Sequence, residues 1–224
     1  MASHLYHFLT RWRLEATAEE AFRLIDSVPD YVRWWPAVWL RVEVLEPGDA
    51  DGIGGRARLT TKGYLPYILT WEGTTLEKTF PQRKVFRASG DFEGHGIWTF
   101  RPDGSFVDVE YNWEIVADKP LLKYLSFLFR PLFAFNHNWA MARGEESLRL
   151  ELARCRARSQ EELARIASPP ASARGGAGGS AWGLEGGRAA SSQPLQQQTE
   201  PAFPASEVKP HPADFLLAIR LAQL

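Results

Sequence analysis

Hydrophobic and polar residues alternate along several short stretches in the first half of the chain. In "HLYHFLTRWRL", residues 4–14, one face would carry Tyr6, Phe8, Thr10, Trp12 and Leu14. Because successive side chains of a strand point to opposite faces, this pattern predicts a strand with an aromatic inner face. The turn-forming sequence "RPDG" predicts a hairpin between the last two of six further strands. Those strands are expected near residues 40–45, 55–62, 67–77, 84–89, 94–101 and 105–116.

Helical spacing interrupts the alternation twice. After the first strand, Thr17 and Glu20 form a capping-box pattern ahead of the helically spaced Phe22 and Ile25, so one short helix, followed by a second, is expected. From residue 120 to about 158 the hydrophobic period is near 3.6, which predicts a long C-terminal helix. A strand, two short helices, six antiparallel strands and a long helix define an α+β fold class.

The composition changes sharply after the long helix. Residues 161–211 are rich in Gly, Pro, Ser and Gln and have no hydrophobic period, which predicts a disordered tail. Residues 212–224 regain helical spacing at Leu217, Leu221 and Leu224, which predicts a short amphipathic helix. The functional domain is therefore expected within residues 1–160.

Charge and cysteine content exclude several classes of protein. The chain has 26 Lys and Arg against 27 Asp and Glu, so its overall charge disfavours a nucleic-acid or anionic-membrane partner. Its single cysteine, Cys155, excludes an internal disulfide and a Cys-rich zinc site. Residues 120–135 are too short and too interrupted by charge and proline to span a bilayer. No signal peptide is recognised, so a cytoplasmic protein is expected.

Strand alternation separates one histidine from the expected interior. In "GDFEGHGIWTF", inward positions for Trp98 and Phe100 place His95 outside, while Gly94 and Gly96 leave room on the inner face. The same reasoning on "SFVDVEYNWEI" places an apolar wall inside, formed by Val107, Val109, Tyr111, Trp113 and Ile115.

The long helix places a second histidine toward the sheet. On a 3.6-residue period one stripe contains Phe133, His137, Met141, Gly144, Leu148 and Leu152. His137 is either a hydrogen-bonded core residue or a proton donor or acceptor directed into a cavity. A nearly opposite stripe, Leu132, Phe135 and Trp139, requires a cover: the short helices near Trp34 and Trp35, a dimer mate or a membrane surface.

Three motifs carry a family resemblance over roughly residues 3–155. They are the Pro-x-Arg turn at Pro81, the "GDFEGHGIWTF" strand, and the helix with "NHNW" at Asn136 and "GEE" at Gly144. Together they resemble the START-like superfamily, also named SRPBCC, and its polyketide cyclase/dehydrase-like proteins. The resemblance implies a helix-grip fold: a curved antiparallel sheet of about seven strands wrapped on the long C-terminal helix, with an internal apolar cavity.

An aromatic-lined cavity would be a small-molecule site. The expected ligand-binding residues are Tyr67, Trp71, Trp98, Phe100, Tyr111, Trp113, Phe133, His137 and Met141. Binding of a hydrophobic molecule such as a lipid, a quinone or a polyketide-like compound is favoured, because no inward Asp or Glu accompanies His137. The alternative is a polyketide cyclase/dehydratase-type enzyme in which His137 transfers a proton, so the enzyme question stays open. No cofactor or metal ligand set is expected, since His4 and His7 would project to opposite faces.

Overall fold

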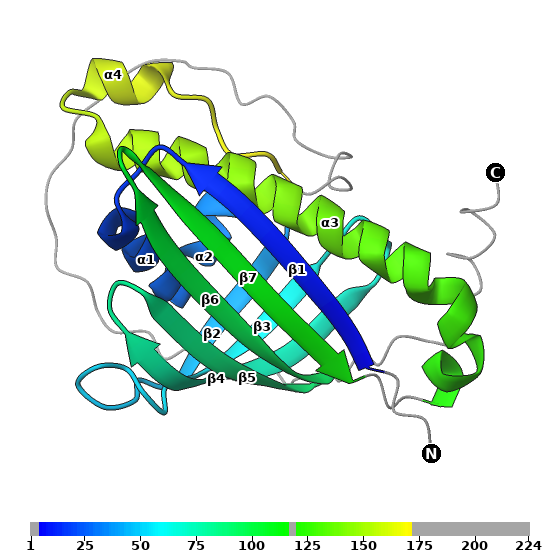
Figure 1. Ribbon diagram of the computed structural model, residues 1–224. Coiled ribbons are helices and arrows are strands. Elements are labelled where there is room, and N and C mark those ends of the chain that lie inside the picture. Colours follow the sequence, from blue (N-terminus) through cyan, green and yellow to red (C-terminus); the bar gives the residue numbers. More distant parts are fainter. Residues whose placement is uncertain (1–4, 117–119, 172–224) are drawn as a thin grey trace, which may run out of the picture. The chain divides into compact units, whose positions relative to one another are not determined.

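The computed structural model describes residues 5–116 and 120–171 (Figure 1). The helix expected at residues 212–224 lies outside the described residues. In chain order the elements are β1 (Leu5–Leu14), α1 (Ala18–Asp26), a 3₁₀ turn (Val28–Asp30), α2 (Tyr31–Trp34), β2 (Trp39–Glu46), β3 (Arg56–Lys62), β4 (Ile68–Thr79), β5 (Arg83–Gly90), β6 (Glu93–Asp103), β7 (Phe106–Val116), α3 (Pro120–Arg156) and α4 (Gln160–Arg165). The order agrees with the α+β prediction.

The seven strands form one antiparallel sheet in the order β1-β7-β6-β5-β4-β3-β2. Figure 1 shows the sheet curving, with α3 running along it beside β1 and with α1 and α2 at the end where β1 finishes. The "RPDG" hairpin joins β6 to β7, with Asp103 opposite Phe106 and Gly104 in a left-handed conformation at φ +62°. This arrangement is the helix-grip fold expected from the sequence.

The capping box at the start of α1 forms as the sequence indicates. The Thr17 hydroxyl accepts a hydrogen bond from the Glu20 amide at 3.2 Å, and the Thr17 amide donates to the Glu20 carboxylate at 2.8 Å. Both bonds satisfy amide groups that a helix start leaves unpaired. The helix then buries Ala21, Phe22 and Ile25 against the rest of the domain. Local sequence thus fixes where α1 begins and which face it turns inward.

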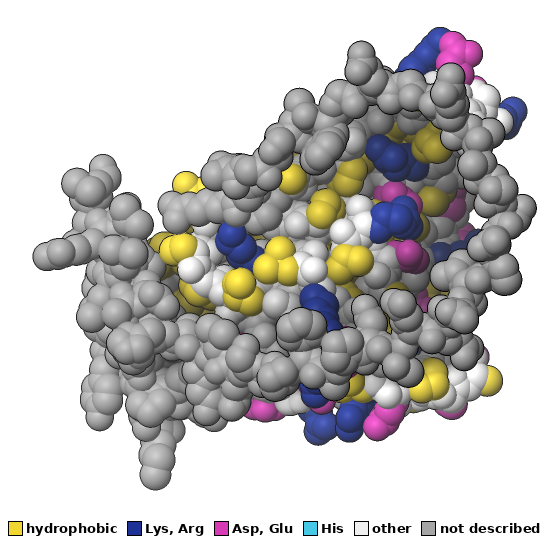
Figure 2. Space-filling view, turned by 180° about the vertical axis from the view of Figure 1, so that it is seen from behind, with side chains coloured by type: hydrophobic (Ala, Val, Ile, Leu, Met, Phe, Trp, Pro, Cys, Tyr) yellow, Lys and Arg dark blue, Asp and Glu magenta, His cyan; other side chains and the backbone are white. Residues whose placement is uncertain are grey.

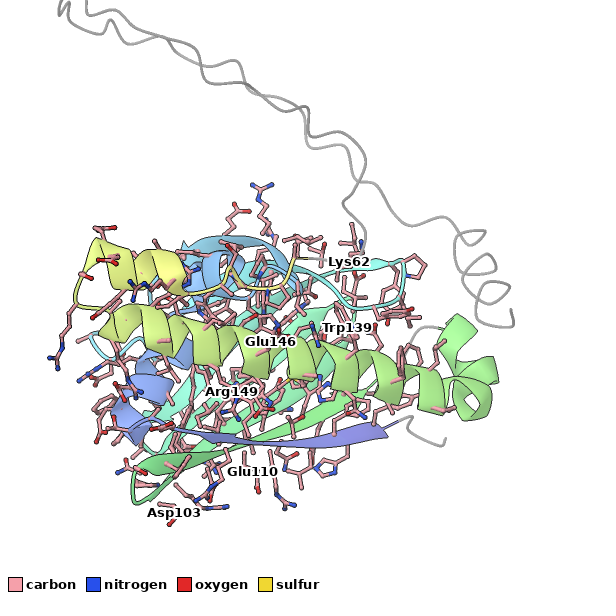
Figure 3. The ribbon with its side chains drawn as sticks, turned by 90° about the horizontal axis from the view of Figure 1, so that it is seen from above. Lys62, Asp103, Glu110, Trp139, Glu146 and Arg149 are labelled. Carbon is pink, nitrogen blue, oxygen red and sulfur yellow. The ribbon has the colours of Figure 1, made fainter. Side chains whose placement is uncertain are left out.

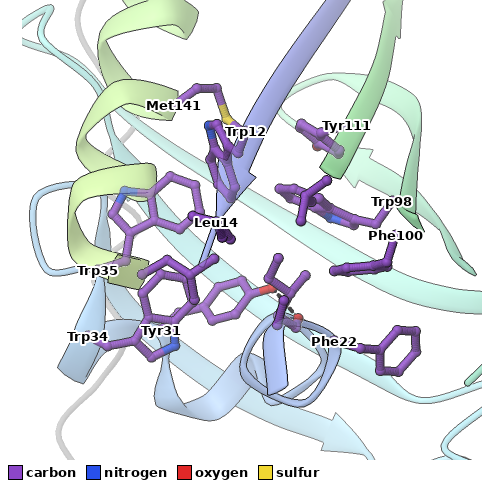
Figure 4. Packing of buried hydrophobic residues seen from close by; sticks show 14 of the residues in the cluster. Trp12, Leu14, Phe22, Tyr31, Trp34, Trp35, Trp98, Phe100, Tyr111 and Met141 are labelled. Carbon is purple, nitrogen blue, oxygen red and sulfur yellow. Dashed lines mark hydrogen bonds between the residues drawn. The ribbon is translucent and has the colours of Figure 1, made fainter. Parts of the chain in front are cut away.

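A close contact between α3 and α2 closes one end of the core. Gly144 is buried, and a Cβ atom there would lie 2.3 Å from a ring carbon of Trp35. Trp35 also contacts the rings of Trp12 and Trp34, at centroid distances of 6.1 and 5.5 Å. Figure 4 shows this cluster between α3, β1 and the short helices. The glycine therefore lets the backbone of α3 approach an indole ring directly.

The described chain continues beyond residue 160. The helix α4 begins after Ser159, whose hydroxyl accepts from the Glu162 amide at 3.1 Å. Arg154 of α3 donates to the carbonyls of Ile166 and Ala167, at 3.3 and 2.9 Å. The first residues of the segment expected to be disordered are thus helical and fastened to α3, and residues 172–224 lie outside the described part.

Candidate functional site

The inner face of the sheet is aromatic, as strand alternation predicts. Gly94, Gly96, Trp98 and Phe100 are buried on β6, whereas His95 is exposed. On β7 the buried positions are Val107, Val109, Tyr111 and Trp113. His95 is therefore outside the concave face.

Aromatic rings on this face form a continuous stack across the central strands. Trp98 and Tyr111 lie opposite each other on β6 and β7 and stack with centroids 4.0 Å apart and an interplanar angle of 14°. Phe86 on β5 continues the stack to Trp113 at 5.5 Å. A Cβ atom on Gly96 would lie 2.3 Å from the Phe86 ring, so the glycine makes room for that ring.

Burial decreases along the concave face from one end to the other. At the α1 end Leu14 is 0% exposed, and Phe100 is 2% exposed and packs on Phe22 at 5.2 Å. Toward the start of β1, Tyr6 is 8% exposed, and Phe8 and Thr10 are only half-buried. Phe100 thus belongs to the packed core rather than to the accessible end. The concave face is thus fully packed at the α1 end and less completely buried at Phe8 and Thr10 near the start of β1, which is called its accessible end below.

His137 faces the sheet, as its helical stripe predicts, and it meets the edge strand β1. Its Nε2 lies 3.1 Å from the Thr10 hydroxyl, and its ring stacks on Phe8 with centroids 4.5 Å apart. Burial disfavours the charged imidazolium and lowers the pKa of His137 to about 4. Within the described part of the chain, Thr10 is the hydrogen-bond partner found for this ring. His137 is therefore a neutral polar group in an aromatic setting at pH 7.

The other expected lining residues occupy different depths. Trp71 is buried, and its indole N–H donates to the Thr61 hydroxyl at 3.2 Å. Phe133 lies edge-on to Tyr6 at 5.6 Å, near the accessible end. Met141 is buried beside Trp12 in the core (Figure 4). Thus Trp71 and Phe133 join the aromatic face, whereas Met141 supports it from the packed end.

Asn136 joins α3 to the segment between β3 and β4, a role the sequence did not indicate. Its side-chain carbonyl accepts from the Leu65 amide at 3.1 Å, and its Nδ2 donates to the Tyr67 hydroxyl at 3.4 Å. Burial raises the pKa of Tyr67 to about 12, so this hydroxyl stays protonated. The polar run Asn136–Asn138 in an otherwise apolar helix was the available signal.

The opposite stripe of α3 has a cover that the sequence prediction did not include. The Tyr64 ring lies edge-on to Phe135 at 5.2 Å and to Trp139 at 5.9 Å. In Figure 3, Trp139 lies on the side of α3 toward Lys62, while Arg149 lies on the other side, where it donates to the Arg13 carbonyl of β1. Of the three covers that the sequence left open, the helices near Trp34 and Trp35 belong to the core cluster against which Trp139 packs, and Trp35 itself lies against Gly144 on the buried stripe.

A partly buried ion cluster of Asp26 with two lysines fixes α1 to the sheet away from the aromatic site. Lys84 of β5 and Lys78 of β4 both lie 2.8 Å from carboxylate oxygens of Asp26, the last residue of α1. Burial lowers the pKa of Lys84, although Asp26 opposes this shift. Burial alone would raise the pKa of Asp26, but the two lysines hold it below its usual value. Lys84 shares its strand face with Phe86 and Ala88, so alternation could have indicated an inward lysine.

The described residues offer little support for other kinds of site. Among them, no group of three or more His, Cys, Asp or Glu is arranged to hold a metal ion. No helix in the described part of the chain is long and apolar enough to cross a membrane. Figure 2 shows hydrophobic side chains scattered among charged ones on the rear face, where grey atoms cover part of the surface. The concave aromatic face with His137 is therefore the candidate site.

A curved sheet gripping a long helix, with an aromatic concave face, defines a helix-grip protein of the START-like (SRPBCC) superfamily. Residues 14–151 match the family model for polyketide cyclase / dehydrase and lipid transport. The match covers more than half of the chain, so the chain belongs to this family. No curated protein sequence matches the chain.

Solved structures share the fold at low sequence identity. TTHA0849 from Thermus thermophilus is 18% identical with a TM-score of 0.56, over 68% of this chain and 100% of that one. The Zhui aromatase/cyclase from Streptomyces sp. R1128 is 16% identical with a TM-score of 0.57, over 69% and 98%. The di-domain ARO/CYC BexL from the BE-7585A biosynthetic pathway is 16% identical with a TM-score of 0.51, over 70% and 51%. These likenesses show the fold alone.

Proposed function

We propose that the protein binds an uncharged, hydrophobic small molecule between the aromatic face of the sheet and α3. The ligand class includes lipids, quinones and polyketide-like aromatic compounds. The supporting observation is the stacked wall of Trp98, Tyr111, Phe86 and Trp113, which leads to an end of the sheet where burial is incomplete. Aromatic walls with few polar groups are typical of small-molecule sites.

His137 and Thr10 supply a polar anchor at the accessible end. Because the pKa of His137 is about 4, the imidazole is neutral at pH 7 and can donate from one ring nitrogen while accepting at the other. With Thr10 occupying Nε2, the remaining nitrogen is available to a hydroxyl or carbonyl group of a ligand. This pair would orient an otherwise apolar molecule.

The alternative is proton transfer by His137 in a cyclase or dehydratase reaction. Its position on the concave face favours this reading, but its lowered pKa weakens it. A base works best when its pKa lies near the operating pH, and a neutral imidazole with a pKa of about 4 neither donates readily as an acid nor accepts strongly as a base. Binding is therefore preferred to catalysis.

The test is equilibrium binding of 1-N-phenylnaphthylamine, an uncharged naphthalene dye whose emission rises in apolar surroundings. The Trp113→Leu variant should raise the Kd by at least about tenfold, since Trp113 contributes to the stacked wall. Glu114→Gln is the matched control, because Glu114 is the next residue on the strand and is exposed.

Two checks make the outcome decisive. Trp113→Phe retains an aromatic ring and should bind almost as the parent does, which separates loss of the wall from loss of folding. Circular dichroism melting of each variant verifies that the fold survives. Equal Kd values for Trp113→Leu and Glu114→Gln, or no binding to the parent, would reject the proposed site.

A further inference from the structure

We propose that Trp12 and Tyr111 form a donor pair that binds one uncharged carbonyl oxygen of the ligand inside the concave site. The site thereby selects aromatic ketones and quinones over hydrocarbons and carboxylates of similar size. This inference rests on the proposed binding function, which the stacked wall supports. Loss of the donor pair changes which ligand is preferred, whereas loss of the wall weakens every ligand, so experiment can separate the two proposals.

Trp12 carries a buried donor without a partner. The residue is 3% exposed, and its indole N–H has no hydrogen-bond partner within residues 5–116 and 120–171. Figure 4 shows the indole nitrogen on the side of the ring that faces Met141 of α3, between the sheet and the helix. An unpaired N–H in such a place costs free energy, which a hydrogen-bond acceptor recovers. The group therefore indicates that the site receives an acceptor.

Tyr111 brings a second donor to the same face of the sheet. It lies opposite Thr10 on β1, and Trp12 is two residues further along the same strand face. Tyr111 is 8% exposed, and none of the described residues forms a hydrogen bond with its hydroxyl. Burial raises the pKa of Tyr111, so this hydroxyl keeps its proton at pH 7 and can donate it. The face beside Thr10 thus holds two neutral donors.

The two rings that carry the donors contact the same third ring. Trp98 stacks on Tyr111 with centroids 4.0 Å apart, and it meets Trp12 at 5.4 Å. Trp98 therefore supports both rings, while the hydroxyl hydrogen of Tyr111 remains free to rotate toward a ligand. A carbonyl oxygen has two lone pairs, so one such oxygen can accept from both donors.

Three other indole N–H groups lack a partner among the described residues, but they are placed elsewhere. Trp34 lies within α2 and Trp35 directly follows that helix. Trp39 begins β2, at the opposite edge of the sheet from β1. These three groups are therefore not neighbours of Thr10 on β1, and they provide a comparison for the donor pair.

The charges around the donor pair favour a neutral oxygen. Lys84 lies opposite Trp98 on the neighbouring strand, but its ammonium is directed to α1. There it lies 2.8 Å from a carboxylate oxygen of Asp26 and 3.3 Å from the Asp26 carbonyl. His137 is neutral at pH 7, because burial lowers its pKa to about 4. A ligand carboxylate at the donor pair would thus be buried without a charged partner, which is costly.

Three naphthalene ligands of nearly equal size test the donor pair. 2-Acetylnaphthalene carries a ketone, 2-isopropenylnaphthalene has a CH2 group in place of the oxygen, and 2-naphthoate carries a carboxylate. Competition with bound 1-N-phenylnaphthylamine at pH 7 gives each Kd. In the parent, 2-naphthoate should bind at least about tenfold more weakly than the ketone, because its charge must be desolvated.

Removing either donor should weaken the ketone selectively. Tyr111→Phe removes one oxygen atom and should raise the Kd of the ketone by about three- to tenfold, with the Kd of the alkene changed by less than about twofold. Trp12→Phe changes the fit of both ligands, so the ratio of their Kd values is the measure, and it should change by a similar factor.

Tyr31→Phe and Trp35→Phe are the matched controls. The Tyr31 hydroxyl already donates to the Ile25 carbonyl, and Trp35 packs against Gly144 at the packed end of the core. Both controls should leave the ratio of the ketone and alkene Kd values unchanged. Circular dichroism melting verifies that each variant folds, and Tyr111→Phe decides alone if Trp12→Phe does not.

The infrared carbonyl stretch of the bound ketone gives a second readout. Donated hydrogen bonds weaken the C=O bond, so the frequency should be lower in the parent than in Tyr111→Phe. A Kd ratio that neither variant changes, or the same stretch in both proteins, would overturn the donor pair while leaving the binding function intact. Binding of 2-naphthoate as tight as that of the ketone would overturn the selection of an uncharged oxygen. Absence of dye binding to the parent would overturn the binding function, and the donor pair with it.

Discussion

Asn136 and His137 are consecutive residues of α3 that form hydrogen bonds to two distant parts of the sheet. Asn136 holds the segment between β3 and β4, and His137 contacts Thr10 on the edge strand β1. Successive residues of a helix point about 100° apart, so neighbouring side chains can reach different sides. One turn of α3 therefore ties the β1 edge to the β3–β4 side across the open end of the curved sheet.

Inward His137 and outward His95 should differ in their effect on stability. We expect His137→Ala to lower the free energy of unfolding by about 1–3 kcal/mol, because it removes the partner of Thr10 and the stacking on Phe8. His95→Ala should stay within about 0.5 kcal/mol of the parent, because His95 is exposed. Denaturant midpoints measure both, and a large loss at His95 with none at His137 would reverse the assignment.

Because His137 is buried, the free energy of unfolding should depend on pH. Its folded-state pKa of about 4 lies below the unfolded value near 6.5, so the unfolded chain binds the proton more readily. The stabilising contribution is complete above pH 6.5 and decreases as the pH falls toward 4, by about 3 kcal/mol in total.

A variant with a non-titrating side chain isolates this contribution. Between pH 7 and 4.5 the parent should lose more unfolding free energy than His137→Gln, with the difference measured by urea unfolding at each pH. Parallel pH curves for the two proteins would show that His137 titrates normally in the folded state.

Gly144→Ala adds one methyl group to α3 and should destabilise the protein, although alanine has a higher helix propensity than glycine. Alanine is favoured over glycine in a helix by about 1 kcal/mol, but a Cβ at Gly144 would lie 2.3 Å from the Trp35 ring. We expect Gly144→Ala to cost about 1–3 kcal/mol through displacement of that ring. Ala142→Gly, at an exposed position of the same helix, should cost about 1 kcal/mol from propensity alone. A higher melting temperature for Gly144→Ala would contradict the contact.

Replacing Asp26 should lower the free energy of unfolding more than replacing Lys84. Asp26→Leu leaves Lys84 buried without its carboxylate and should cost about 3–5 kcal/mol. Lys84→Met should cost less, because Asp26 keeps its bond to Lys78. The double variant should recover part of the loss, which a double-mutant cycle measures. Additive effects of the two changes would show that Asp26 and Lys84 act independently.

Much of this fold follows from local pattern. The inward face of β7 and the outward position of His95 follow from alternation, because a strand face needs only neighbouring residues to define it. His137 follows from helical spacing in the same way. The partners did not follow: nothing near Asn136 in sequence identifies Leu65, which is 71 residues away, and nothing near Asp26 identifies Lys84. Such pairs are set by the curvature of the sheet, which brings distant segments together.

Seven tryptophans are joined through successive ring contacts, with centroids no more than 6.2 Å apart. They are Trp12, Trp34, Trp35, Trp39, Trp71, Trp98 and Trp113. Electronic excitation passes readily between identical chromophores this close, because transfer falls steeply with distance. The seven indole rings should therefore share excitation energy, so that the tryptophan fluorescence has low anisotropy. An energy acceptor bound beside Trp113 alone would then quench the fluorescence of all seven tryptophans, whichever of them absorbed the light.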